Sequence, residues 1–215
     1  MMLSQFNPKP DLRVIKFFNK WFSVMRAWQR MLSGRRLNLL DPSPLDIEIE
    51  DIAHGLSRVA RWNGQTSGDC AFTVAQHCVV VVDLIQRFKV DPTPQWRLAG
   101  LLHDAAEYVI GDLISPFKAA VGLDYKSLET SLQRAIHIRI GLPTDMPKSA
   151  QTLIKRADRA SAYLEATQLA GFESPEAGRL FGHFKGIDDI RLIPASAEQA
   201  KAMFMERFES LDNAG

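Results

Sequence analysis

Three polar side chains fall inside an apolar, helix-forming stretch, and this feature constrains the fold more than any other. His103, Asp104 and Glu107 lie between Leu101 and Ile110, a segment without glycine or proline. A helix turns about 100° per residue, so Glu107 would lie one turn beyond the His103–Asp104 pair on the same side. Burying an imidazole beside two carboxylates is costly unless the groups are paired or hold a metal. We therefore expect these groups to pair with one another or to bind a metal ion.

Helical periodicity recurs along most of the chain and predicts an all-α fold. Apolar residues at helical spacing predict further helices over 51–62, 72–88, 125–140, 148–169 and 196–211. Ser196 and Gln199 have the spacing of a capping box that opens the last helix. Residues 171–193 are expected to be mostly loop.

Residues 37–49 fit two structures. Leu37 to Leu40 and Ile47 to Ile49 alternate in polarity around a proline-rich turn, which favours a short β-hairpin. A helix that begins at Pro44 is the alternative, because apolar residues keep helical spacing as far as Val59. The sequence leaves both possibilities open before Asp51, and both predict a helix after it.

The composition indicates a single domain. The chain has 215 residues, of which 46% are hydrophobic, enough for a sizeable core. A net charge of +1 gives no overall field that would attract nucleic acid or acidic membranes. The 2 cysteines favour a reducing compartment, and neither a signal peptide nor a membrane-spanning run is evident. We expect a cytoplasmic protein with no membrane span and no nucleic acid polymer as partner.

The first 36 residues differ from the rest of the chain. Between Leu12 and Leu40 there is no acidic residue, while basic and aromatic residues interleave at rough helical spacing. Such a basic amphipathic helix can lie on a membrane surface, or it can dock its aromatic face on its own domain or on a partner subunit. We favour docking. The expected organisation is a basic amphipathic segment over 1–36 and a single domain over 37–215.

The candidate metal ligands come from three predicted helices. His77 shares a face with apolar residues, and Asp158 lies near the apolar side of its helix. Together with His103 and Asp104 they supply two imidazoles and two carboxylates. This set suits a divalent transition metal better than calcium or magnesium, whose ligands are oxygens. A water molecule activated by such a metal is a nucleophile at neutral pH, which points to hydrolysis.

The order of these residues resembles the signature of the HD-domain metal-dependent phosphohydrolases: a His, a His-Asp pair and a distal Asp. Within that superfamily the chain is most similar to the small bacterial 5′-deoxynucleotidases and to related deoxynucleoside triphosphohydrolases of phages and bacteria. The similarity covers roughly residues 50–168. It rests on these segments: Arg61-Trp62, Val74-Ala75-Gln76-His77, Leu101-Leu102-His103-Asp104-Ala105-Ala106-Glu107, Gly111-Asp112-Leu113-Ile114-Ser115-Pro116-Phe117-Lys118 and Lys155-Arg156-Ala157-Asp158.

The resemblance implies an HD-domain helical bundle with a core at about residues 50–168 and a C-terminal helical extension. It also implies one divalent transition metal per chain (Mn, Co, Ni, Fe or Zn), bound by His77, His103, Asp104 and Asp158. The remaining histidines (His54, His137 and His183) have no partner in this pattern, and we expect them to be structural or exposed.

The same resemblance assigns roles to residues around the metal. Glu107 would handle the nucleophilic water or the leaving-group proton, and Asp112, the second candidate catalytic residue, would border the sugar and phosphate. Arg61, Trp62 and Lys118 would bind phosphate and nucleoside. On this basis we expect Arg61 to matter to the substrate more than to the fold.

The expected function is hydrolysis of a phosphate ester of a (deoxy)nucleotide by a metal-activated water. The activity would be that of a 5′-nucleotidase or of a dNTP triphosphohydrolase. The alternative is an HD-domain sensor that binds nucleotides without turnover. We expect a small-molecule nucleotide substrate and a homo-oligomer, dimeric or higher.

Overall fold

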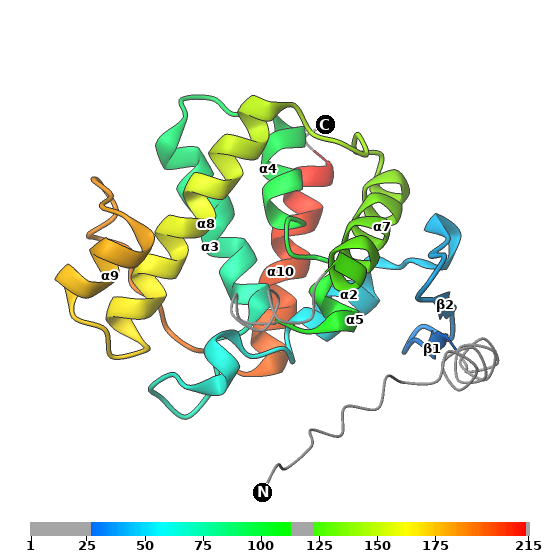
Figure 1. Ribbon diagram of the computed structural model, residues 1–215, viewed down its shortest axis with the longest axis horizontal. Coiled ribbons are helices and arrows are strands. Elements are labelled where there is room, and N and C mark those ends of the chain that lie inside the picture. The colour runs from blue at the N-terminus through cyan, green and yellow to red at the C-terminus, as the bar shows by residue number, and fades with distance from the viewer. Residues whose placement is uncertain (1–26, 113–122, 214–215) are drawn as a thin grey trace, which may run out of the picture.

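The computed structural model describes residues 27–112 and 123–213 and is mostly helical, which confirms the predicted all-α class (Figure 1). Its α-helices are α2 (Ile49–Leu56), α3 (Val74–Phe88), α4 (Pro94–Leu101), α5 (Glu107–Ile110), α7 (Leu123–Ile140), α8 (Lys148–Gln168), α9 (Ser174–Phe181) and α10 (Ala197–Asp212). Two 3-10 helices, η1 (Pro44–Asp46) and η2 (Arg61–Gly64), lie in the connections.

Helix α3 is central and packs against α4, α8 and α10 (Figure 1). It begins where the Thr73 side chain accepts a hydrogen bond from the Gln76 amide, a typical N-cap. Most of its side chains are buried, as expected for a helix that is apolar nearly all round. One apolar cluster packs α3 against α2, α4, α7 and α10. A second cluster packs it against α8 and the segment around Ile187.

The long helices lie close to where periodicity predicts them. Helices α3, α7, α8 and α10 match the predicted segments within a few residues at each end. The capping box is also confirmed, because the side chains of Ser196 and Gln199 each accept from the other's backbone amide. Helix α9, by contrast, lies within the segment expected to be loop. It is only 8 residues long, so its amphipathic pattern covers about two turns, too few to stand out from the surrounding loop residues.

A short hairpin is present, but it is built from earlier residues than 37–49 suggest. Strands β1 (Trp28–Arg30) and β2 (Arg36–Asn38) pair antiparallel, with Trp28 opposite Asn38. Ser33, in the connecting turn, donates from its amide and hydroxyl to the buried Asp51 carboxylate of α2, at 2.9 and 2.5 Å. Because a buried carboxylate needs donors, this contact fixes the hairpin against α2.

Two predicted helices are interrupted. The helix expected to reach Trp62 ends at Leu56, and Trp62 itself has a left-handed φ of 56°, which no regular α-helix allows. The helix expected around His103 stops at Leu101, and α5 starts only at Glu107. Residues 102–106 therefore form a turn between α4 and α5, and we call this segment the His103 turn.

Some expectations fall outside the described residues. These are most of the basic N-terminal segment (residues 1–26) and Lys118. The rest of that N-terminal segment belongs to the hairpin. In the parts of the chain that the structure describes, no helix is both long and apolar enough to cross a membrane.

Candidate metal centre

His77 lies in the first turn of α3 and is fully buried. Its Nδ1 atom is 2.6 Å from Oε1 of Glu165 on α8. An ionised carboxylate only accepts hydrogen bonds, so the proton of the neutral imidazole is on Nδ1. The lone pair of Nε2 is then directed away from Glu165. This is the tautomer in which histidine binds a metal through Nε2.

His103 is fixed in the same tautomer by a different partner. Its Nδ1 is 2.8 Å from the carbonyl oxygen of Gly100, which again only accepts. The Nε2 atoms of His103 and His77 lie 3.3 Å apart. When each ring carries its proton on Nδ1, two lone pairs face one another at this distance. A shared proton or a cation is needed to stabilise that arrangement.

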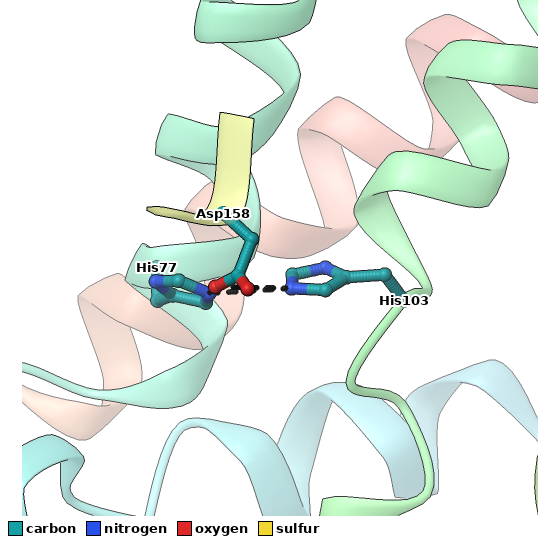
Figure 2. Close-up of side chains that lie close together, drawn as sticks. All are labelled: His77, His103 and Asp158. Carbon is teal, nitrogen blue, oxygen red and sulfur yellow. Dashed lines mark hydrogen bonds and ion pairs between the residues drawn. The ribbon is translucent and has the colours of Figure 1, made fainter. Parts of the chain in front are cut away.

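Two carboxylates complete the cluster. Oδ2 of Asp104 is 3.2 Å from Nε2 of His103 and 3.6 Å from Nε2 of His77. Oδ1 of Asp158, on α8, is 3.4 Å from Nε2 of His77 and 4.0 Å from Nε2 of His103. Figure 2 shows the His77, His103 and Asp158 side chains converging from three segments of the chain.

The four side chains expected to bind a metal are thus brought together. Ligand atoms of His77, His103 and Asp158 all lie within 4.8 Å of one another, and Asp104 contacts both imidazoles. Two imidazole nitrogens and two carboxylate oxygens are ligands that fit a divalent transition metal. An acceptor that fixes the Nδ1–H group, as Glu165 and Gly100 do for these two rings, accompanies most histidine ligands of metals.

The electrostatics of the cluster favour a cation. Burial lowers the pKa of His103, but the Asp104 carboxylate outweighs it, so this pKa lies well above its ordinary value. Burial likewise raises the pKa of Asp104, yet the neighbouring His103 holds that pKa far below its usual range. The carboxylates therefore stay ionised and draw positive charge into the cluster. A metal would supply that charge in place of the protons.

Glu165, which is not among the residues predicted from the sequence, connects the cluster to the residues predicted to bind substrate. It is fully buried on α8; Oε1 accepts from His77 and from the Ser161 hydroxyl, at 2.6 and 2.9 Å. Burial raises its pKa, but Arg61 and His77 lower that pKa by more, so the side chain stays ionised. Its position was detectable, because Glu165 lies seven residues after Asp158 and so on the same face of the helix.

Arg61 and Trp62 both donate to this glutamate. Nε of Arg61 and Nε1 of Trp62 are 3.0 and 2.9 Å from Oε2 of Glu165. The Nη1 atom of Arg61 is 2.8 Å from Oδ2 of Asp112, so the guanidinium bridges two carboxylates. The Trp62 ring packs against Phe172 and Phe181. In this structure the Arg61 side chain is 14% exposed and takes part in the buried network behind His77.

Glu107 is the first residue of α5 and is buried. It lines a cavity of about 500 Å³ together with His103, Asp104 and Asp158. We call this cavity the metal pocket. The predicted proton-transfer residue and three of the predicted ligands therefore border one space large enough for a small molecule.

Gln133 of α7 holds the His103 turn at both ends. Its Nε2 donates to the carbonyl oxygen of Leu102 at 2.6 Å, and its Oε1 accepts from the Ala106 amide at 3.3 Å. His137, one helical turn on, is buried; its Nε2 lies 3.1 Å from Nε2 of Gln133 and its Nδ1 2.7 Å from the Pro143 carbonyl. The two hydrogen bonds of Gln133 explain why residues 102–106 form a turn although the local sequence favours a helix.

Fold and site together define an α-helical protein with a buried cluster of two histidines and two carboxylates that could hold a metal. No protein-family model matches the sequence. An uncharacterized protein of Rhodobacter capsulatus is 59% identical over 159 residues, which cover 74% of this chain and 81% of that protein. The uncharacterized protein YfdR of Escherichia coli is 31% identical over 166 residues, covering 77% of this chain and 85% of YfdR. The chain belongs to the family that contains these two proteins.

Proposed function

We propose that this protein is a metal-dependent phosphohydrolase of the HD-domain type that acts on (deoxy)nucleotides. One observation carries the proposal: the Nε2 atoms of His77 and His103 face each other at 3.3 Å, beside carboxylate oxygens of Asp104 and Asp158. A core with no functional role is not expected to contain four such groups together. Burying them costs free energy that only a shared cation or protons offset.

The chemistry follows from what the residues around this cluster can do. The four side chains would hold a divalent transition metal, which would supply Lewis-acid charge and make a water molecule more acidic. Glu107 borders the same pocket and can take or return a proton there. Lys155 also lines the pocket and supplies positive charge for a phosphate group. Reaction class and residue roles are therefore mutually consistent.

We also propose that the enzyme is cytoplasmic. Cys70 and Cys78 are both free thiols, which fits the reducing cytoplasm. We also propose a homo-oligomer, dimeric or higher, with a small-molecule nucleotide as substrate. Light scattering of the purified protein would give the number of subunits directly.

A substrate screen tests the activity. The purified protein is incubated with nucleoside mono-, di- and triphosphates and Mn²⁺, Co²⁺ or Ni²⁺, and released phosphate, pyrophosphate and triphosphate are measured. We expect hydrolysis that requires metal. Tight binding of a nucleotide with no hydrolysis under any condition would contradict the proposal and favour a nucleotide sensor.

Elemental analysis tests the metal assignment separately. We expect about one transition metal per chain in the wild type and a large loss in Asp104→Ala, because the variant removes one ligand. Asp145→Ala is the matched control, since Asp145 lines the same pocket, is exposed and pairs with Arg134 instead. Equal metal content in wild type and Asp104→Ala would refute the ligand set.

A further inference from the structure

A second cavity, of about 390 Å³, lies between α8 and the segment that follows α9. Three of the side chains that line it are cationic, one is a histidine and two are aromatic: Lys155, Arg156, Arg159, His183, Phe181 and Phe184. No acidic residue of the described chain lines it. We call it the basic groove.

Within residues 27–112 and 123–213, no carboxylate neutralises the lysine and arginines of the groove. Among the described residues, no acidic side chain forms an ion pair with Lys155, Arg156 or Arg159. Arg156 instead lies over the Phe88 ring, with its guanidinium carbon 4.2 Å from the ring centroid, and Phe184 stacks on the same ring. An aromatic face orients a guanidinium while leaving its N–H donors available to a ligand. Three like charges within five residues of one helix repel one another, and an anion would relieve that repulsion.

The groove and the metal pocket share one lining residue. Lys155 lines both cavities. Asp158, one helical turn further along α8, belongs to the metal cluster. Arg159 is one turn beyond Lys155, about 6 Å along the helix axis. A row of cations therefore runs from the edge of the metal cluster into the groove.

We infer that the basic groove binds the phosphates of a substrate that lie beyond the one at the metal, so the substrate is a nucleoside polyphosphate. Binding of a polyphosphate by the groove stands on the groove's own geometry, while its identity as part of a substrate rests on the proposed function. The guanidinium group of arginine forms paired hydrogen bonds with the oxygens of phosphate groups, including those of a polyphosphate. The small volume of the groove and the net charge of +1 favour a short polyphosphate over a nucleic acid strand.

Calorimetric titration with inorganic tripolyphosphate tests the groove. The double variant Arg156→Gln/Arg159→Gln should bind it ~10–100-fold more weakly than the wild type, as expected for the loss of two charge-assisted contacts. Both side chains are exposed, so the fold should be kept, and an unchanged melting temperature checks this. Arg179→Gln is the matched control, an exposed arginine of α9 outside the groove, and should bind tripolyphosphate like the wild type.

Activity assays separate this inference from the proposed function. In the double variant we expect kcat/KM for a nucleoside triphosphate to fall ~10-fold or more, with monophosphate hydrolysis within twofold of wild type. Wild-type tripolyphosphate affinity in the double variant would overturn the groove while leaving the proposed hydrolysis intact. Loss of tripolyphosphate binding in a protein that hydrolyses nothing would keep the groove and reject the proposed function. Tighter, groove-dependent binding of a single-stranded oligonucleotide would overturn the polyphosphate assignment.

Discussion

Arg61 is placed where the loss of its charge affects the fold as well as any substrate. Its guanidinium lies 3.0 Å from Glu165, which is fully buried, and 2.8 Å from Asp112. Burial lowers the pKa of Arg61, but Glu165 and Asp112 raise that pKa well above its ordinary value, so the side chain is always charged. The family resemblance implied a residue that matters to the substrate more than to the fold. The two short ion pairs change that expectation.

We predict that Arg61→Ala destabilises the protein by about 3–5 kcal/mol, because it removes the guanidinium partner of the buried Glu165 carboxylate. For a chain of this size, each kcal/mol lowers the melting temperature by about 2–4 °C. Thermal unfolding followed by circular dichroism measures the change. Arg58→Ala, an exposed arginine three residues earlier, should change the melting temperature far less. Equal melting temperatures for Arg61→Ala and the wild type would show that Arg61 is no structural partner of Glu165.

A variant of Glu107 distinguishes hydrolysis from metal binding. Glu107 borders the metal pocket beside three of the four candidate ligands but is not one of the four. We predict that Glu107→Gln, which keeps size and loses the titrating group, lowers kcat by on the order of 10²–10⁴. Metal content should stay at the wild-type level, since the ligand set is intact. Hydrolysis at the wild-type rate would remove Glu107 from the proton-transfer step.

At the scale of elements, the His103 turn is the part that the sequence describes worst. Residues 101–110 contain no glycine or proline, so nothing local breaks the helix. The helix is interrupted by Gln133 of α7, whose side chain hydrogen-bonds to the Leu102 carbonyl and to the Ala106 amide. A contact between residues about thirty positions apart leaves no periodic signal. Long helices such as α3 and α8 were predictable because their buried stripes repeat along many turns.

The identity of the candidate ligands could be predicted from the sequence, whereas their hydrogen-bond partners could not. A histidine or aspartate in an apolar helical stretch stands out in the sequence, and four of them do so here. Glu165 was missed although it lies on the same face of α8 as Asp158, because its role depends on the imidazole of His77 on another helix. Residue type and burial were visible in the sequence, whereas hydrogen-bond partners required the fold.

Gln133→Ala tests the contact between α7 and the His103 turn. Without its amide, the Leu102 carbonyl and the Ala106 N–H lose their partners and the His103 turn is free to shift. We predict a decrease of about 10–100-fold in metal affinity, the usual effect of losing a residue that orients a ligand. Competition with a chelating dye measures it. Thr130→Ala, which lines the same pocket one turn earlier on α7, should bind metal like the wild type. A normal affinity in Gln133→Ala would show that the turn keeps its shape without Gln133.

At the scale of the whole molecule, the candidate ligands lie on parts of the chain that are far apart in sequence and pack together largely through apolar side chains. His77 is on the central helix α3, Asp158 is on α8, and His103 with Asp104 lies on the turn after α4. Helices α3 and α4 contribute to one apolar cluster, whereas α8 packs on α3 largely through the other. A metal held by all four side chains would therefore cross-link both halves of the core (Figure 1).

Metal binding should therefore stabilise the whole fold. A ligand that binds only the native state adds about 2.7 kcal/mol when present at a hundred times its dissociation constant. We predict that removing metal with a chelator lowers the melting temperature of the wild type by about 5–10 °C. Adding back Mn²⁺, Co²⁺ or Ni²⁺ should restore it. The melting temperature of Asp104→Ala should respond to neither treatment, while that of Asp145→Ala should respond like the wild type. The contrary result is a wild-type protein in which elemental analysis shows bound metal but the melting temperature does not depend on it. In that case the ligands of the metal do not join α3, α8 and the His103 turn.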